Sequence, residues 1–125
     1  MRVSHRVLGI AAGVFVALVG SGIASAQDPA VVNAATIKVK LENARVRVLE
    51  AVLKPGDKEQ LHSHPAYVIH VLAGGRVRNH TPDGKSNETE LTAGETLYRD
   101  PLTHWAENIG TTTIHLILVE LKDPA

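Results

Sequence analysis

Two histidines separated by a single residue are the part of this sequence best suited to bind a metal ion. They are His62 and His64, and alternate residues of an extended strand point to the same side. Both imidazoles could therefore reach one ion, and we predict that His104, forty residues later, completes the site. Imidazole suits Zn, Fe, Mn, Ni or Cu better than Ca or Mg, so the predicted cofactor is a divalent transition metal of open identity.

Three protein ligands would leave coordination positions open for water or substrate, which is typical of catalytic metal sites. The chain has no cysteine, so only nitrogen and oxygen ligands are available. The plainer alternative is that His62 and His64 are exposed loop histidines before Pro65, and that His104 is an ordinary half-buried histidine. The spacing of the pair and the third histidine favour the metal site.

Tyr67 and His70 are further candidates near the histidine pair. Tyr67 could line the pocket and donate its hydroxyl to a substrate. If a regular strand begins there, Tyr67, Ile69 and Val71 share one face, and His70 points away from the metal. A β-bulge would reverse this arrangement, so His70 is a reserve ligand.

Other side chains of chemical interest have no motif to support them. We interpret His80 and His115 as structural or surface residues, and Trp105 as a packing residue. Three arginines could reach an anionic ligand, although charges on a solvated strand face are commoner. These are Arg76, Arg78 and Arg99.

The elements that must position the histidines are short strands. Alternating apolar and polar residues are typical of half-buried strands, and glycine and proline mark the turns between them. About eight strands and no long helix are predicted, which indicates an all-β sandwich or barrel. The expected strands are residues 36–41, 45–53, the two sides of Pro65 within 61–72, 76–80, 87–91, 96–99 and 111–121.

Two motifs in this order resemble those of the cupin family, a superfamily of RmlC-like jelly-roll proteins. The first cupin motif is a glycine, five residues, then His-x-His, with a glutamate shortly after. The second ends in a histidine followed by an asparagine four positions later. The resemblance spans about residues 36–121 and implies a jelly-roll β-barrel with a metal held by the three histidines. It rests on Gly56, His62 and His64, and on Gly94, His104 and Asn108.

The chain departs from the cupin motifs at the metal-binding glutamate. Depending on the direction of counting, Val68, Ile69 or Tyr67 stands at that position, and none is a carboxylate. The second motif also lacks its Pro-x-Gly and is one residue shorter than expected. A neutral triad would leave the charge of the metal uncompensated, which should strengthen anion or substrate binding and acidify bound water. It could equally weaken metal retention.

The resemblance leaves the activity open. It allows dioxygenase, isomerase, lyase and decarboxylase chemistry on a small molecule, but fold alone does not give function. One alternative is a non-catalytic cupin that binds a small molecule or only metal. Another is a structural cupin without metal that forms a homodimer.

The N-terminus has the composition of a secretory signal peptide. Arg2 and Arg6 precede an apolar run over residues 7–19, and residues 24–26 form an Ala-x-Ala cleavage site. We therefore predict a cleaved signal peptide over residues 1–26 and a periplasmic or secreted protein. The alternative is an uncleaved N-terminal anchor.

The expected exported chain is a single domain. Residues 27–35 are predicted as an N-terminal linker and residues 36–125 as the cupin domain. Lysine and arginine number 13, as do aspartate and glutamate, and loss of Arg2 and Arg6 would leave a slight negative charge. Without a basic patch we expect no nucleic-acid partner, and after cleavage we expect no membrane attachment.

Overall fold

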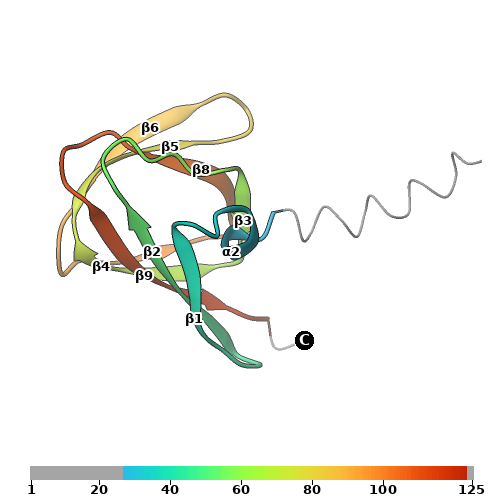
Figure 1. The fold of residues 1–125 in the computed structure, drawn as a ribbon. Helices are drawn as coiled ribbons and strands as arrows, with labels where there is room; N and C mark the ends of the chain where they lie inside the picture. Colours follow the sequence, from blue (N-terminus) through green and yellow to red (C-terminus); the bar gives the residue numbers. More distant parts are fainter. Residues whose placement is uncertain (1–26, 124–125) are drawn as a thin grey trace, which may run out of the picture.

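The computed structural model describes residues 27–123, so the predicted signal peptide lies outside the described residues. Within this range, nine strands form two antiparallel sheets (Figure 1). The five-stranded sheet has the order β1-β2-β9-β4-β7, and the four-stranded sheet has the order β3-β8-β5-β6. The elements are α2 (Pro29–Val32), β1 (Ile37–Glu42), β2 (Val46–Leu53), β3 (His62–His64), β4 (Tyr67–Ala73), β5 (Gly75–His80), β6 (Ser86–Leu91), β7 (Thr96–Arg99), β8 (Leu102–Asn108) and β9 (Ile114–Leu121).

The predicted all-β jelly-roll architecture is confirmed, with nine strands in place of about eight. The additional strand is β8, which the sequence did not delimit. Its buried positions include His104, Ala106 and Asn108, whereas Trp105 lies on the other face and is only half-buried. Because two of the inward residues are polar, β8 lacks the apolar alternation that identifies a half-buried strand.

The core lies between the two sheets and is built by residues that alternate along the strands. In β4, Tyr67, Ile69 and Val71 are buried, as their predicted common face requires. In β2, Leu49 and Leu53 are buried in the same way. Burying one large apolar side chain contributes about 1.5–3 kcal/mol, so these alternating rows hold the sheets together around the site.

Pro65 and Gly74 mark the points where the chain passes from one sheet to the other. The predicted break at Pro65 separates β3 from β4, which belong to different sheets. At Gly74 the chain crosses back between β4 and β5. A Cβ on Gly74 would lie 2.0 Å from the carbonyl oxygen of Leu91, so only glycine fits this crossing.

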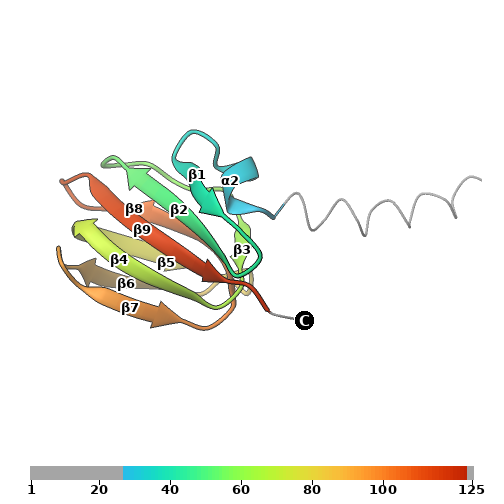
Figure 2. The same ribbon diagram turned by 90° about the horizontal axis from the view of Figure 1, so that it is seen from below.

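Residues 27–35 differ from the linker predicted for them, because they fold onto the barrel. Asp28 caps α2 by accepting a hydrogen bond from Ala30 N at 2.9 Å, and Arg47 donates to both Asp28 oxygens at 2.8 and 3.0 Å. Asn33 is buried after the helix. Short polar segments of this kind resemble linkers in composition, but here the capping and ion-pair contacts fix the segment beside β3 (Figure 2). Among residues 27–123, no helix is long and apolar enough to cross a membrane.

Candidate metal centre

The structure brings the three predicted histidines together on neighbouring strands. β3 pairs with β8 so that His62 lies directly opposite His104, and His64 is two residues further along β3. The three side chains are buried, with exposed fractions of 0%, 5% and 7% for His62, His64 and His104. One ligand nitrogen from each ring lies within 4.8 Å of the other two. Strand pairing therefore converts two distant sequence motifs into one compact cluster.

Acceptor oxygens behind the rings fix which nitrogen of each imidazole carries the proton. His62 Nδ1 lies 2.7 Å from the carbonyl oxygen of Gln60. His64 Nδ1 lies 2.6 Å from Glu120 Oε2, and His104 Nδ1 lies 3.0 Å from the side-chain oxygen of Asn79. Each Nδ1 therefore faces an acceptor, although the amide nitrogen of Asn33 also lies 3.1 Å from His62 Nδ1. In the tautomer that these acceptors favour, with the proton on Nδ1, each Nε2 keeps a free lone pair.

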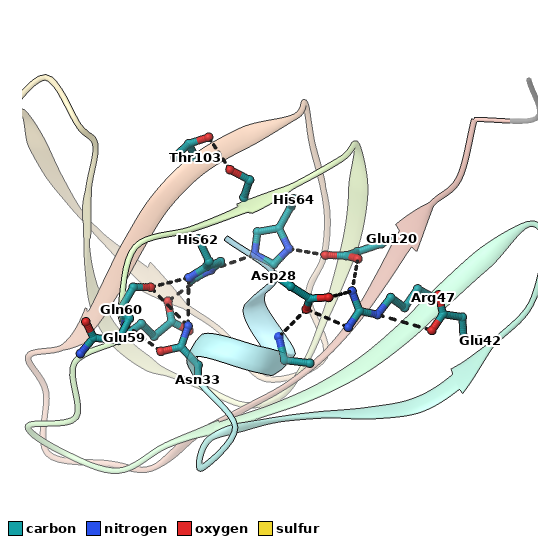
Figure 3. Close-up of polar contacts among 12 residues, drawn as sticks. Asp28, Asn33, Glu42, Arg47, Glu59, Gln60, His62, His64, Thr103 and Glu120 are labelled. Atoms are coloured by element: carbon teal, nitrogen blue, oxygen red, sulfur yellow. Dashed lines mark hydrogen bonds and ion pairs between the residues drawn. The ribbon is translucent and has the colours of Figure 1, made fainter. Parts of the chain in front are cut away.

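The Nε2 atoms of His62 and His64 face each other across 3.1 Å (Figure 3). With the proton on Nδ1 in both rings, two lone pairs meet and neither nitrogen can donate. A cation placed between them removes the conflict. Two nitrogens bound at about 2.0–2.1 Å to one ion, at tetrahedral or octahedral angles, lie about 2.8–3.4 Å apart, so the observed separation fits a shared metal ion.

Burial keeps two of the histidines in the neutral form that binds metals. Desolvation lowers the pKa of His62 to about 4 and that of His104 to about 3. The neighbouring histidines lower both values further. At neutral pH both rings are therefore uncharged, and their lone pairs are available without the loss of a proton.

A chain of ion pairs supports His64 from behind. Arg47 lies 3.9 Å from Glu120 and 2.8 Å from Asp28. Glu120 is buried on β9, in the sheet opposite His64. A carboxylate that accepts the outer proton of a metal-binding imidazole orients the ring and raises its basicity, so β9 and the N-terminal segment both stabilise the position of this ligand.

Asn33 and Gln60 hold His62 in a corresponding way. The side-chain oxygen of Asn33 accepts a hydrogen bond from Gln60 N at 2.7 Å, and its amide nitrogen lies 3.3 Å from Gln60 O. Gln60 O is the same oxygen that accepts from His62 Nδ1. The residues that follow α2 therefore fix the backbone that orients the first ligand.

Glu59 is a buried carboxyl group at the edge of the histidine cluster. Its Oε1 lies 3.7 Å from His62 Nε2 and accepts a hydrogen bond from Ala106 N at 2.9 Å. Burial raises the pKa of Glu59 to about 7, while the bond from Ala106 acts in the opposite direction. Because His62 is neutral at this pH, the contact is not an ion pair. The side chain can both accept and release a proton near neutral pH.

A cavity of about 70 Å³ lies beside the histidines, and both sheets contribute to its wall. One water needs about 10–15 Å³ of such space, so the cavity could hold several waters or a ligand of a few non-hydrogen atoms. His64, His104 and Glu59 line it together with mostly apolar side chains. Tyr67 also lines it, as the sequence predicted for a pocket residue, and its ring stacks on His64 with centroids 4.3 Å apart.

The phenol of Tyr67 is a poor candidate for an anionic metal ligand. Desolvation raises its pKa to about 12, so the hydroxyl keeps its proton at neutral pH.

His70 is exposed on the outer face of β4 and contacts Thr96 at 2.8 Å. No bulge precedes it in the pairing with β9, where the register shifts only after Val71. The structure therefore places the reserve ligand away from the cluster.

The remaining predicted residues lie outside the site, with one exception. His80 stacks on Trp105 with centroids 3.6 Å apart, and His115 pairs with Glu50 at 2.6 Å. Both histidines are structural, as interpreted from the sequence. Arg76 and Arg78 pair with Glu88 on the surface. Arg99 differs, because it lines the cavity.

The motif residues other than the histidines have backbone roles. Gly56 and Gly94 occupy turns with φ of 89° and 90°, which glycine adopts without strain. Asn108 donates to the carbonyl oxygens of Leu53 and Thr112 at 2.9 and 2.8 Å. These residues shape the loops around the cluster and do not join it.

Sequence reasoning missed the residues that surround the three histidines. Glu120 had a usable signal, because it continues the alternating row of Ile114, Leu116 and Leu118 in β9. Ile114, Leu118 and Glu120 are buried, and a carboxylate on a buried face needs a polar partner. Glu59 had no such signal, since it lies outside any regular strand.

Comparisons with known proteins agree with this architecture. No protein-family model matches the chain, and no curated protein matches it. Among solved structures, a cupin domain from Bordetella pertussis Tohama I matches with a TM-score of 0.64 and 29% sequence identity, over 70% of this chain and 92% of that chain. The chain folds as a cupin.

Other solved structures match at lower identity and support the fold alone. An RmlC-like cupin family protein with a double-stranded β-helix fold from Methanocaldococcus jannaschii matches with a TM-score of 0.56 and 14% identity, over 70% of this chain and 80% of that chain. A conserved protein with a double-stranded β-helix domain from Klebsiella pneumoniae matches with a TM-score of 0.53 and 25% identity, over 70% and 71% of the two chains.

Proposed function

We propose that this cupin binds a divalent transition metal through His62, His64 and His104 and acts on a small molecule in the adjoining cavity. The observation that carries the proposal is the 3.1 Å approach of two Nε2 atoms whose rings both donate outward through Nδ1. When bound, such an ion supplies Lewis-acid chemistry, or redox chemistry if it is iron.

Glu59 is the proposed proton-transfer group of this site. The cupin glutamate is absent from its motif position, but Glu59 brings a carboxyl group to within 3.7 Å of His62 Nε2. Its pKa of about 7 is suited to general acid–base work at neutral pH. The cavity wall is mostly apolar but also carries His64, His104 and Glu59. Polar groups that converge in an apolar pocket are typical of a small-molecule site and support dioxygenase, isomerase or lyase chemistry over a non-catalytic module.

The metal proposal is tested by unbiased metal analysis of protein purified without a histidine tag. We expect a stoichiometric divalent ion in the wild type and its loss in His62→Ala and His104→Ala. His115→Ala is the matched control, since His115 is bound to Glu50 away from the cluster. Equal metal content in all four proteins would remove the proposal and would leave a proton shared by His62 and His64 as the explanation for their contact.

The alternative of a non-catalytic binding module is separated from an enzyme by Glu59→Gln. Glutamine keeps an oxygen that can accept the hydrogen bond of Ala106 but cannot transfer a proton. An enzyme should retain its metal in this variant and lose most of its turnover on any substrate found by activity screening. A module that only binds should show no turnover in either form.

We also propose export to the periplasm or medium, supported by the signal-like composition of residues 1–26. N-terminal sequencing of the exported protein should give Gln27 as the first residue.

A homodimer is proposed as well, because one apolar row crosses the outer face of the five-stranded sheet, with Leu41 51% and Tyr98 57% exposed. Light scattering of the wild type and Tyr98→Asp tests the dimer. The row is Leu41, Val48, Val119, Val68 and Tyr98.

A further inference from the structure

Arg99 is a cation in the cavity wall that forms no ion pair with a carboxylate of residues 27–123. Its side chain is half-buried at the end of β7 and lines the cavity with His64 and His104. Among residues 27–123, no carboxylate oxygen lies within 4.0 Å of its guanidinium group. Its one side-chain hydrogen bond is a long one, 3.5 Å, to the carbonyl oxygen of Tyr98.

Three other arginines of the described chain have carboxylate partners, whereas Arg45, which has none, is exposed to solvent. Arg47 binds Asp28 and Glu120, and Arg76 and Arg78 bind Glu88. Arginine presents a planar fork of donors that matches a carboxylate. A half-buried guanidinium without such a partner therefore has donors available for an anion in the cavity.

A second donor is directed into the same cavity from the neighbouring strand. Tyr67 pairs with Arg99 across β4 and β7, and the two residues line one wall. Tyr67 is 2% exposed, yet its hydroxyl has no hydrogen-bond partner among the described residues. Because the side chain lines the cavity, this hydroxyl is available to donate a hydrogen bond to a ligand there.

We infer that the cavity binds a small carboxylate, held by the guanidinium of Arg99 and the hydroxyl of Tyr67 next to the histidine cluster. This rests on the proposed function for the metal that the carboxylate would adjoin. The cavity volume of about 70 Å³ limits the ligand to a few non-hydrogen atoms. Among the described residues that line the cavity, Arg99 is the one arginine or lysine and Glu59 the one carboxyl group.

Acetate and its uncharged isostere acetamide are the probes for this inference. Each is titrated by NMR into metal-free and zinc-loaded protein, and the zinc content of every sample is measured. We expect acetate to bind and acetamide to bind at least ~10-fold more weakly, because hydrogen bonds between charged partners are the stronger ones. Equal affinity for the two probes would overturn the inference.

Variants assign the binding to the two side chains. Arg99→Gln should weaken acetate binding at least ~10-fold, and Tyr67→Phe should also weaken it by roughly 10-fold or more, the effect of one hydrogen bond to a charged group. Arg99→Lys keeps the charge and should retain part of the affinity. Arg76→Gln is the control, because Arg76 is paired with Glu88 on the surface. Wild-type acetate affinity in a folded Arg99→Gln protein would overturn the inference.

The two proposals fail in different ways in this experiment. Protein that takes up no zinc but binds acetate through Arg99 would contradict the metal site and support the anion site. Protein that holds zinc through the histidines but binds acetate equally well without Arg99 would support the metal site and contradict the anion site. Thermal unfolding of each variant shows that it is folded before its affinity is compared.

Discussion

Glu120 Oε2 lies 2.6 Å from Nδ1 of His64, and the two buried residues come from opposite sheets. The carboxylate of β9 therefore orients a ligand of β3 across the interior of the barrel. This contact ties the position of the proposed metal to the packing of the two sheets. It also gives the site an acidic group that the motif position after His64 lacks.

Replacing Glu120 with glutamine should weaken metal binding by about 10–100-fold, the usual effect of losing the partner of a ligand histidine. Glutamine has a similar size but lacks the negative charge that stabilises the Nδ1 proton. The measurement is a competition titration with a chelator. Glu42→Gln is the control, because Glu42 contacts Arg47 and Lys122 at the surface. Equal affinities in both variants would show that Glu120 does not orient His64.

Removing the side chain of Asn33 should reduce both stability and metal affinity. Asn33→Ala leaves Gln60 N without its buried acceptor, at a cost of about 1–3 kcal/mol in the free energy of unfolding. His62 should also become less well ordered, because Gln60 O orients it. Asn87→Ala, at an exposed position of β6, is expected to change neither quantity. Chemical unfolding and zinc titration of both variants provide the measurements.

The metal-free protein should lose stability as the pH falls from about 6.5 toward 4. The pKa values of His62, about 4, and His104, about 3, lie below the ordinary value of 6.5. Between these values the unfolded chain binds more protons than the folded chain, so acid favours unfolding. Urea unfolding in the presence of a chelator, repeated across this range, measures the slope. His104→Asn should flatten it, and an unchanged slope would mean that His104 is not buried in the neutral form.

Glu59 should have the opposite pH dependence. Its folded-state pKa, about 7, lies above the ordinary value of 4.5, so its contribution to stability is full below 4.5 and is lost as the pH rises through 7. Glu59→Gln removes this loss, and the variant should therefore gain stability relative to the wild type between pH 5 and pH 8. In Glu90→Gln, at an exposed position of β6, the free energy of unfolding should change with pH as it does in the wild type. If the stability of Glu59→Gln changed with pH as that of the wild type does, the raised pKa of Glu59 would be contradicted.

Local patterns in the sequence were sufficient for most of the fold. The alternation in β4 predicted that Tyr67 and Ile69 face inward and that His70 faces outward, because side-chain direction in a regular strand depends only on position. Pro65 predicted a break, since proline cannot donate to a strand ladder. The two cupin motifs predicted that His62, His64 and His104 meet, but the pairing of β3 with β8 that brings them together came from the structure.

The surroundings of the site depend on tertiary contacts that local patterns do not contain. Glu59 lies in an irregular segment, where no periodicity says which way a side chain points. The role of Asn33 arises from the folding of residues 27–35 onto β3, and the composition of that segment does not distinguish it from a linker. The half-buried position of Arg99 depends on the pairing of β7 with β4, which sets Arg99 opposite the buried Tyr67 and which the sequence of one strand does not reveal.

The supporting contacts also imply an order of events during biosynthesis. Two ligands lie on β3, early in the domain, but His104 comes late and Glu120 lies on β9, the last strand. A ribosome-bound chain that lacks β9 cannot yet offer the complete binding geometry. Tight metal uptake must therefore follow the closure of the barrel, so the compartment in which the chain folds determines which ions can reach the site. For an exported chain, the metal supply of the cell envelope would govern which ion occupies it.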